Sequence, residues 1–150
     1  MALSRRRVGG HLIVYDQATS RRLARFGHET STPERLVRSF LSSAGLRFRT
    51  HNRDLPGSPD VANRSKKWAV FVHGCYWHHH AGCYRATVPT RNRAFWLAKF
   101  RDNRRRDRRV VSQLERAGFT VAVVWECEAV APRVLGRRLA EVVRIARQRG

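Results

Sequence analysis

The hydrophobic and polar positions of this chain fall into segments with the period of a helix and segments with the pattern of a strand. The first clear segment along the chain has the helical period. Residues 31–45, STPERLVRSFLSSAG, have Ser31 and Glu34 at capping-box spacing and end at Gly45, so they are predicted to form a helix. Residues 132–149, PRVLGRRLAEVVRIARQR, predict an amphipathic helix that closes the chain. The apolar residues in phase are Leu36, Phe40 and Leu41 in the first helix and Leu135, Leu139, Val142 and Ala146 in the second.

Between these helices the pattern changes to that of strands. Residues 46–55 alternate apolar and polar side chains, which predicts a strand. The stretch LPGSPD is typical of a turn, and a short strand is expected to follow from Asp60. Two continuous apolar runs, 66–74 and 119–126, predict buried strands. The residues from 90 to 118 predict a long helix, either continuous or split at the arginine-rich stretch around Asp107.

This order of elements, α-β-β-β-α-β-α, predicts an α/β fold. A helix that connects two apolar strands implies a central mixed β-sheet with helices on both sides. We expect a single domain over residues 31–150, preceded by a flexible basic arm over residues 1–30. No apolar run approaches the ~20 residues of a membrane span, and the N-terminal stretch LIVY is too short for a secretory signal. A soluble, intracellular and cytoplasmic protein is therefore expected.

The net charge narrows the class of partner. Lys and Arg total 31 against 11 Asp and Glu, which gives a net charge of +20. All the basic residues except Lys66, Lys67 and Lys99 are arginines, whose planar guanidinium groups suit phosphates. So large a positive charge favours a polyanion, nucleic acid before membrane. A coding bias towards arginine would explain the choice of Arg over Lys, but it would not explain the excess of positive charge.

Cysteine and histidine concentrate in residues 70–84, VFVHGCYWHHHAGCY. Cys75 and Cys83 flank the run of histidines, and Cys127 follows the last predicted strand. Three thiolates and one imidazole would form a closed tetrahedral zinc site of the structural kind. The alternatives are three unrelated buried cysteines, or a nucleophilic cysteine, for which the chain has no ordered Cys/His/Asn pattern.

Two further positions are candidates for catalysis. Asp60 lies beside a predicted strand and is a candidate Mg²⁺ ligand, although a turn aspartate bonded to its own backbone is the simpler interpretation of Asp60 alone. His73 ends the strand WAVFVH, where an open α/β sheet carries its cleft, although a histidine there also fits a core position. As a pair, the carboxylate could hold a metal while an imidazole moves protons.

Four blocks of the chain, taken together, resemble the very short patch repair (Vsr) endonucleases: DLPGSPD, VFVHGCYWHHHAGC, RAFWLAKFRDNRRRDRR and VAVVWEC. They occur in the family's order and at similar spacing, and the resemblance runs from about Ala18 to Cys127. It implies a restriction-endonuclease-like fold and an enzyme that nicks DNA 5′ to the thymine of a T·G mismatch, which arises when 5-methylcytosine is deaminated. The implied cofactors are catalytic Mg²⁺ and structural Zn²⁺.

The resemblance also implies roles for single residues of the catalytic site. Asp60 matches the family's magnesium-binding aspartate, helped by the backbone carbonyl of Val72. His78 matches the histidine that activates water, and His73 matches the one that contacts the scissile phosphate; either imidazole could be the general base. Glu34 matches another active-site acid. Histidines stand where most restriction-type sites have a second acid and a lysine.

Metal-binding and DNA-binding positions are implied in the same way, and Asp107 matches an acid near the site. The residues that match the zinc ligands are Cys75, His80, Cys83 and Cys127. The residues that match aromatic wedges are Tyr76, Trp77 and Trp96, which from sequence alone fit core packing equally well. Leu23 stands where the family has a methionine in its minor-groove arm, with Phe26 nearby. The phosphate contacts are expected from Arg104, Arg105 and Arg106.

The expected partner is double-stranded DNA with a T·G mismatch, bound by a monomer, and the family suggests a MutL-type repair protein as a further partner. Two other functions fit the residues. One is a restriction-type nuclease that cuts both strands of paired DNA, and the other is a zinc-stabilised DNA-binding module without catalysis.

Overall fold

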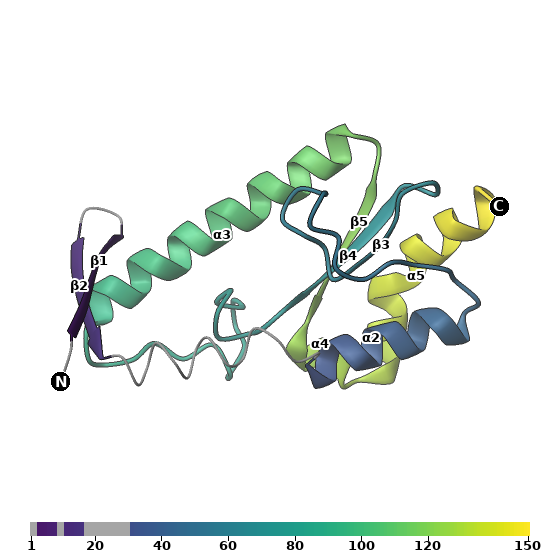
Figure 1. Ribbon diagram of the computed structural model, residues 1–150. Helices are drawn as coiled ribbons and strands as arrows, with labels where there is room; N and C mark the ends of the chain where they lie inside the picture. Colours follow the sequence, from purple (N-terminus) through teal and green to yellow (C-terminus); the bar gives the residue numbers. More distant parts are fainter. Residues whose placement is uncertain (1–2, 9–10, 17–30) are drawn as a thin grey trace.

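The structure is a computed structural model that describes residues 3–8, 11–16 and 31–150. It has the predicted α/β fold, in which a small mixed sheet is flanked by helices (Figure 1). The elements in chain order are β1 (Leu3–Val8), β2 (His11–Asp16), α2 (Thr32–Ser43), β3 (Val61–Asn63), β4 (Trp68–His73), α3 (Arg93–Arg116), β5 (Thr120–Trp125), α4 (Glu126–Ala129) and α5 (Pro132–Gln148). No helix in the described part of the chain is long and apolar enough to cross a membrane.

The central sheet has three strands in the order β3-β4-β5. β3 pairs with β4 in antiparallel orientation, whereas β4 and β5 are parallel, with His73 opposite Trp125 at the end of the pair. The connection between β4 and β5 runs through α3, as the helix between two apolar runs predicted. The strand β4 is central and buried along most of its length, in agreement with its continuous apolar sequence.

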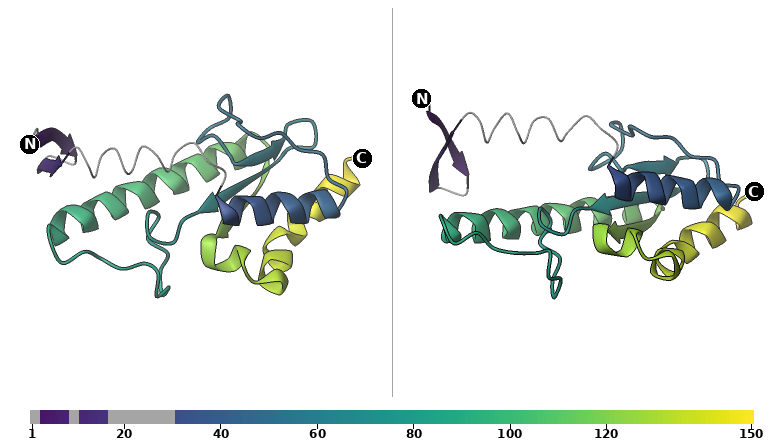
Figure 2. Two further views of the ribbon diagram at one scale, coloured as in Figure 1. Left: turned by 60° about the horizontal axis from the view of Figure 1, so that its bottom comes forward. Right: turned by 90° about the horizontal axis from the view of Figure 1, so that it is seen from below.

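Helices cover both faces of this sheet (Figure 2). Alternate side chains of a strand point to opposite faces. Trp68 and Val70 of β4 therefore belong to the core under α2 and α5, whereas Ala69 and Phe71 belong to a second core that includes Leu114 of α3. By the same alternation His73 points to the α3 side of the sheet, where the candidate site lies.

The helices predicted over residues 31–45 and 132–149 are confirmed as α2 and α5, and most of the residues predicted to be buried are buried. In α2 the hydroxyl of Ser31 accepts a hydrogen bond from the backbone N–H of Glu34 at 3.4 Å, as expected of an N-cap. Leu41 of α2 is buried, but Leu36 is 37% exposed and lies at the edge of the predicted face. All four apolar residues that the period placed on the inner face of α5 are buried: Leu135, Leu139, Val142 and Ala146.

The predicted strand over residues 46–55 is wrong. Only an isolated antiparallel bridge joins Arg49 to Ala62. Leu46 and Phe48 do pack against the core, so the alternation reflects one buried side of an irregular segment. The backbone of His51 has a positive φ of 56°, which ends the extended conformation that a longer ladder would need.

The turn after this segment is held from two sides. Asn52 is buried, and its side-chain amide donates hydrogen bonds to the carbonyls of Arg49 at 2.9 Å and Pro59 at 3.1 Å. Gly57 has a φ of +69°, and a Cβ atom there would lie 2.3 Å from a methyl group of Val110 in α3. Glycine thus permits both the conformation and the close approach to α3, and the turn fixes Asp60 at the start of β3.

The arginine-rich stretch does not break α3, which is continuous, and its N-terminal half extends beyond the sheet (Figure 1). Three elements were not predicted: the strands β1 and β2 and the short helix α4. The strands β1 and β2 pair as an antiparallel hairpin, in register from Leu3 opposite Asp16 to Val8 opposite His11. The short helix α4 begins directly after β5 and turns the chain towards α5.

Candidate active site and metal centre

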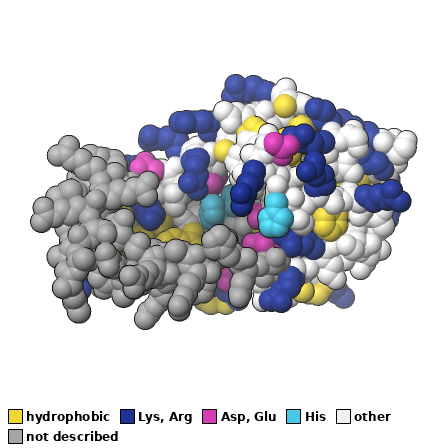
Figure 3. All heavy atoms as spheres, in the orientation of Figure 1, with side chains coloured by type: hydrophobic (Ala, Val, Ile, Leu, Met, Phe, Trp, Pro, Cys, Tyr) yellow, Lys and Arg dark blue, Asp and Glu magenta, His cyan; other side chains and the backbone are white. Residues whose placement is uncertain are grey.

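A cavity of about 460 Å³ opens between the turn before β3, the end of β4 and α3. It collects most of the predicted catalytic residues from three separate segments. Its polar lining residues are Ser58, Asp60, His73, His78, Arg106 and Asp107. The space-filling view shows histidines beside acidic and basic side chains near the centre of one face of the molecule (Figure 3). The structure therefore brings Asp60, His73 and His78 together at one cavity.

Asp60 lies where β3 no longer covers the edge of β4. Its Oδ2 atom accepts a hydrogen bond from the backbone N–H of Val72 at 2.6 Å. Burial raises the pKa of this carboxyl to about 6, against the opposing effect of the Val72 hydrogen bond. Because the N–H and C=O groups of one strand residue point to the same edge, the carbonyl of Val72 also faces the side on which Asp60 lies.

The two histidines of the cavity form a stacked pair. The ring centroids of His73 and His78 are 3.9 Å apart, with an interplanar angle of 4°. His73 is only 6% exposed, and burial, together with the neighbouring His78 and Arg106, lowers its pKa to about 4. His73 is therefore neutral at physiological pH.

His78 is held by an acid from α3. Its Nδ1 atom lies 2.6 Å from Oδ2 of Asp107. Burial raises the pKa of Asp107, but the hydrogen bond to His78 and the nearby positive groups outweigh it and hold that pKa below its usual range. An ionised carboxylate can only accept a hydrogen bond, so Nδ1 of His78 carries the proton and Nε2 is left to act as a base.

Sequence reasoning placed Asp107 near the site without a definite role. A sequence signal for a role of Asp107 does exist: it is a single acidic residue inside a run of five arginines, which include Arg104, Arg105 and Arg106. A lone acid in such a run has no obvious function on the surface. The three named arginines do not act from one side of the helix. Arg106 lines the catalytic cavity, and Arg104 lines a second cavity of about 440 Å³ behind the histidine pair, whereas Arg105 is exposed and lines neither of these two cavities.

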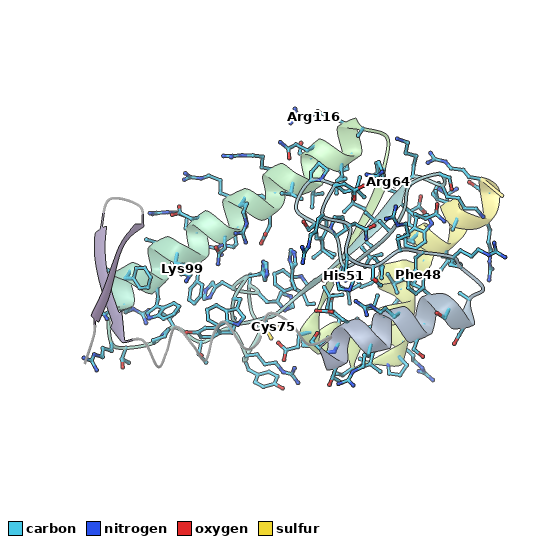
Figure 4. The ribbon with its side chains drawn as sticks, in the orientation of Figure 1. Phe48, His51, Arg64, Cys75, Lys99 and Arg116 are labelled. Carbon is cyan, nitrogen blue, oxygen red and sulfur yellow. The ribbon has the colours of Figure 1, made fainter. Side chains whose placement is uncertain are left out.

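The four predicted metal ligands also converge. The sulfur atoms of Cys75, Cys83 and Cys127 and a ring nitrogen of His80 all lie within 4.8 Å of one another. Nδ1 of His80 is 3.7 Å from the Cys75 sulfur and 3.4 Å from the Cys127 sulfur. Three sulfurs and one imidazole nitrogen match the donors of a closed tetrahedral site, so the cluster could hold a metal ion. Cys75 lies in the loop that leaves β4, near the start of α4 (Figure 4).

The parallel register explains why cysteines so distant in the sequence meet. His73 of β4 lies opposite Trp125 of β5, and a cysteine follows each of them two residues later. The carboxylate of Glu126 strengthens this junction, because it accepts hydrogen bonds from the backbone N–H of Cys75 at 3.2 Å and from Arg85 at 3.1 Å. Glu126 was not predicted to contribute, and sequence offers no signal for it.

The aromatic residues of the loop and of α3 form one cluster rather than separate contacts. The ring of Tyr76 lies 5.1 Å from that of Trp77 and 5.5 Å from that of Phe100, measured between centroids. Trp77 and Trp96 are 6.3 Å apart, and Trp77 remains 37% exposed. The carbonyl of Trp77 accepts a hydrogen bond from the Asn103 side chain at 2.9 Å, which fixes the loop to α3.

One predicted catalytic residue lies apart from the cavity, and two predicted DNA-binding residues lie outside the residues that the structure describes. Glu34 is on α2 and pairs with Arg38 at 3.6 Å. Its negative charge contributes to the raised pKa of Asp60, but Glu34 does not line the catalytic cavity. Leu23 and Phe26, the predicted minor-groove residues, lie outside the residues that the structure describes.

Comparison with known proteins gives the same family as the motifs. Residues 13–85 match the family described as DNA mismatch endonuclease Vsr. Over 134 residues the chain is 38% identical to the DNA mismatch endonuclease Vsr of Escherichia coli. The aligned region covers 85% of each protein. The chain belongs to the Vsr family.

Other Vsr relatives are nicking enzymes. The chain is 43% identical over 115 residues to the type II nicking enzyme V.XorIIP of Xanthomonas oryzae pv. oryzae. This alignment covers 77% of this chain and 84% of that protein. The chain is also 41% identical over 112 residues to the type II nicking enzyme V.NmeAIP of Neisseria meningitidis. This alignment covers 75% of this chain and 79% of that protein. This Vsr-family protein is accordingly a DNA endonuclease of mismatch repair.

Proposed function

We propose that this endonuclease cleaves one strand of double-stranded DNA, on the 5′ side of the thymine in a T·G mismatch. The observation that carries the proposal is the catalytic cavity, which joins a buried carboxylate, Asp60, to a histidine, His78, that is oriented by its own carboxylate partner. A DNA-binding module without catalysis has no use for this arrangement. The relative in Escherichia coli is named a DNA mismatch endonuclease.

The residues at the edge of β4 fit a catalytic magnesium ion. Asp60 offers a buried carboxylate, and the carbonyl of Val72 faces the same side; oxygen atoms of these two kinds are ligands that Mg²⁺ accepts. Bound there, Mg²⁺ would neutralise charge on the scissile phosphate and on the leaving 3′ oxygen. Glu34 would act from a distance through its charge on Asp60.

The histidine pair supplies the proton transfers in this mechanism. Nε2 of His78 accepts a proton from the attacking water, and Asp107 stabilises the imidazolium that results, as a carboxylate does in other histidine bases. The water oxygen bonds to phosphorus and the bond from phosphorus to the 3′ oxygen breaks, which leaves a 5′ phosphate and a 3′ hydroxyl. His73, neutral at physiological pH, hydrogen-bonds to the scissile phosphate, and Arg106 at the cavity contributes positive charge.

The cluster of Cys75, His80, Cys83 and Cys127 fits zinc, because soft thiolates select this metal and the donor set is closed. Bound Zn²⁺ would cross-link the loop after β4 to the start of α4 without taking part in the chemistry. His78 lies in that loop, between Cys75 and His80, so the cluster would position the general base.

The remaining features of the proposal concern fold and partners. A mixed sheet with helices on both faces and a cavity at the strand ends is compatible with a restriction-endonuclease-like fold. A single asymmetric mismatch needs only a monomer. A MutL-type repair protein is the further partner that we propose, and we expect the enzyme to act inside the cell, on the nucleoid.

A nicking assay tests the proposed function. One duplex with a labelled T strand carries a T·G mismatch in a cytosine-methylation context, and its twin is fully paired; both are incubated with Mg²⁺ or with EDTA. We expect Mg²⁺-dependent cleavage of the T strand alone, directly 5′ to the mismatched thymine. Cleavage of both duplexes would indicate a restriction-type nuclease, and tight binding without cleavage would indicate a binding module.

Replacing Trp77 by alanine is expected to weaken binding to the mismatched duplex by roughly 10- to 100-fold, since stacking of one base on an aromatic ring contributes ~1–3 kcal/mol. Trp77 is partly exposed in the aromatic cluster, so its ring is accessible to a base. Affinity for paired DNA should change much less. Tyr84→Ala removes an aromatic ring that is 80% exposed on the same loop and serves as the control. Equal losses on both duplexes would assign Trp77 to core packing.

A further inference from the structure

The arginines of α3 are distributed around the helix, and several of them line neither of the two cavities described above. Arg101, Arg105 and Arg109 are exposed and line neither the catalytic cavity nor the second cavity. We refer to these three residues as the α3 arginine stripe, because they follow one another at intervals of four residues.

The stripe faces away from the catalytic cavity. Phe100 and Leu114 are the buried residues of α3. Asp107 and Val110 are among the α3 residues that line the catalytic cavity. At about 100° per residue, Arg105 lies roughly 160° from Asp107 and about 140° from Val110 around the helix axis. Figure 3 shows Lys and Arg side chains along the outer edge of α3, separate from the histidines at the centre of that face, and Figure 4 shows Arg116 at the far end of the same helix.

The stripe has no acidic partner among the residues that the structure describes. Every ion pair that joins two described residues involves other basic groups, such as Arg106 with Asp107. Like charges four residues apart on a helix repel one another and destabilise it. Three guanidinium groups in a row are therefore unfavourable for folding unless they meet an anion.

The geometry suits the phosphates of a nucleic acid strand. The stripe extends for about 12 Å along α3, which is the length of roughly three to four nucleotides of one strand in a duplex. Guanidinium forks bind phosphates in a bidentate manner. DNA in the catalytic cavity cannot reach the stripe, because the helix is ~10–12 Å thick and a duplex stays nearly straight over far longer distances, with a persistence length of ~150 base pairs.

We propose that the α3 arginine stripe binds a second duplex segment while the first occupies the catalytic cavity. The inference rests on the proposed function insofar as that cavity binds DNA. An enzyme that holds two segments at once can pass directly from one to the other without first dissociating. This surface would shorten the search for a rare mismatch in a large excess of paired DNA.

A competitor-dependent dissociation experiment tests the second surface. The full-length protein is bound to a labelled T·G duplex in EDTA and then challenged with rising concentrations of an unlabelled paired duplex. For the wild type, the dissociation rate should increase linearly with competitor. In the variant R101Q/R109Q, which leaves Arg105 in place, this increase should fall at least about fivefold, and its salt dependence should become less steep by roughly two log units per log unit of salt. The rate extrapolated to zero competitor should stay within about twofold, as should nicking of a short T·G duplex with Mg²⁺.

The matched control is R133Q/R137Q, which removes two exposed arginines from α5 and the same amount of charge. It should retain the competitor dependence. The proposal is overturned if the stripe variant keeps that dependence, if both variants lose it equally, or if the wild type shows none. The readout needs DNA binding but no cleavage, so a failure of mismatch-specific nicking would appear separately in the Mg²⁺ assay.

Discussion

Replacing Asp60 by asparagine is expected to abolish nicking and, in the same protein, to raise the melting temperature in EDTA at pH 7.5. Burial raises the pKa of Asp60 from 3.8 to about 6, so the folded protein binds this proton more tightly than the unfolded chain. The stabilisation from that proton is complete below pH ~4 and is lost as the pH rises through 6. At pH 7.5 the ionised carboxylate therefore costs the folded state roughly 2 kcal/mol, after allowance for residual solvent screening.

Asparagine removes that cost without losing the local structure, because its side-chain oxygen can still accept the hydrogen bond from the Val72 N–H. We expect the melting temperature to rise by about 5 °C at pH 7.5, and the gain to shrink as the pH falls to 5. Nicking should fall by at least about 1,000-fold, since a metal ion contributes several kcal/mol to such a transition state. The control Asp102→Asn, on α3, should change neither quantity. Residual nicking near the wild-type rate would contradict the assignment of Asp60, and a lower melting temperature would contradict the electrostatic cost.

Replacing Cys127 by serine is expected to remove the bound zinc and to lower the melting temperature by ~10 °C or more. The Cys127 sulfur lies 3.4 Å from Nδ1 of His80, and a hydroxyl is a much poorer ligand than a thiolate. Structural zinc contributes ~10–16 kcal/mol in small peptides that fold only with metal; the present domain has its own core, so part of the structure should survive. Nicking should fall by more than about 100-fold, since a misplaced His78 no longer meets the water.

The neighbouring histidines provide a matched pair of variants for this prediction. His80→Ala should reproduce the loss of zinc. His79→Ala should not, because the His79 ring stacks on Phe100 with a centroid distance of 4.7 Å and lies outside the metal cluster. Zinc content measured by mass spectrometry, together with thermal melting, separates the outcomes. An unchanged zinc content in Cys127→Ser would remove Cys127 from the ligand set.

Sequence pattern predicted those elements whose burial is regular along their whole length, on one face of a helix or on both faces of a strand. The helical period of Leu135, Leu139 and Val142 survives in α5 because that helix packs one face on the sheet. The continuous apolar run of β4 likewise reflects a strand covered on both faces. The same logic failed for residues 46–55, because Leu46 and Phe48 bury one side of a segment whose backbone has no strand partner beyond the bridge at Arg49.

The candidate site was predictable as a set of residues but not as a geometry. Motif resemblance drew attention to Asp60, His73 and His78, whose common cavity depends on the antiparallel pairing of β3 with β4 and on the turn that Asn52 holds. The bond between His78 and Asp107 joins a loop to the middle of a long helix, and no local pattern reports such a contact. The division of the arginines among three sides of α3 likewise appears only when the inner face of the helix is known.

The parallel pairing of β4 with β5 also has a consequence for the order of events during synthesis on the ribosome. Cys75, His80 and Cys83 emerge early, but Cys127 can join them only after α3 and β5 have formed and placed Trp125 opposite His73. Domains fold as units while the chain is still being made, beginning with the N-terminal part. A nascent chain consequently lacks the completed cluster and a positioned His78 until most of the protein has left the ribosome, and truncated products should be harmless to DNA.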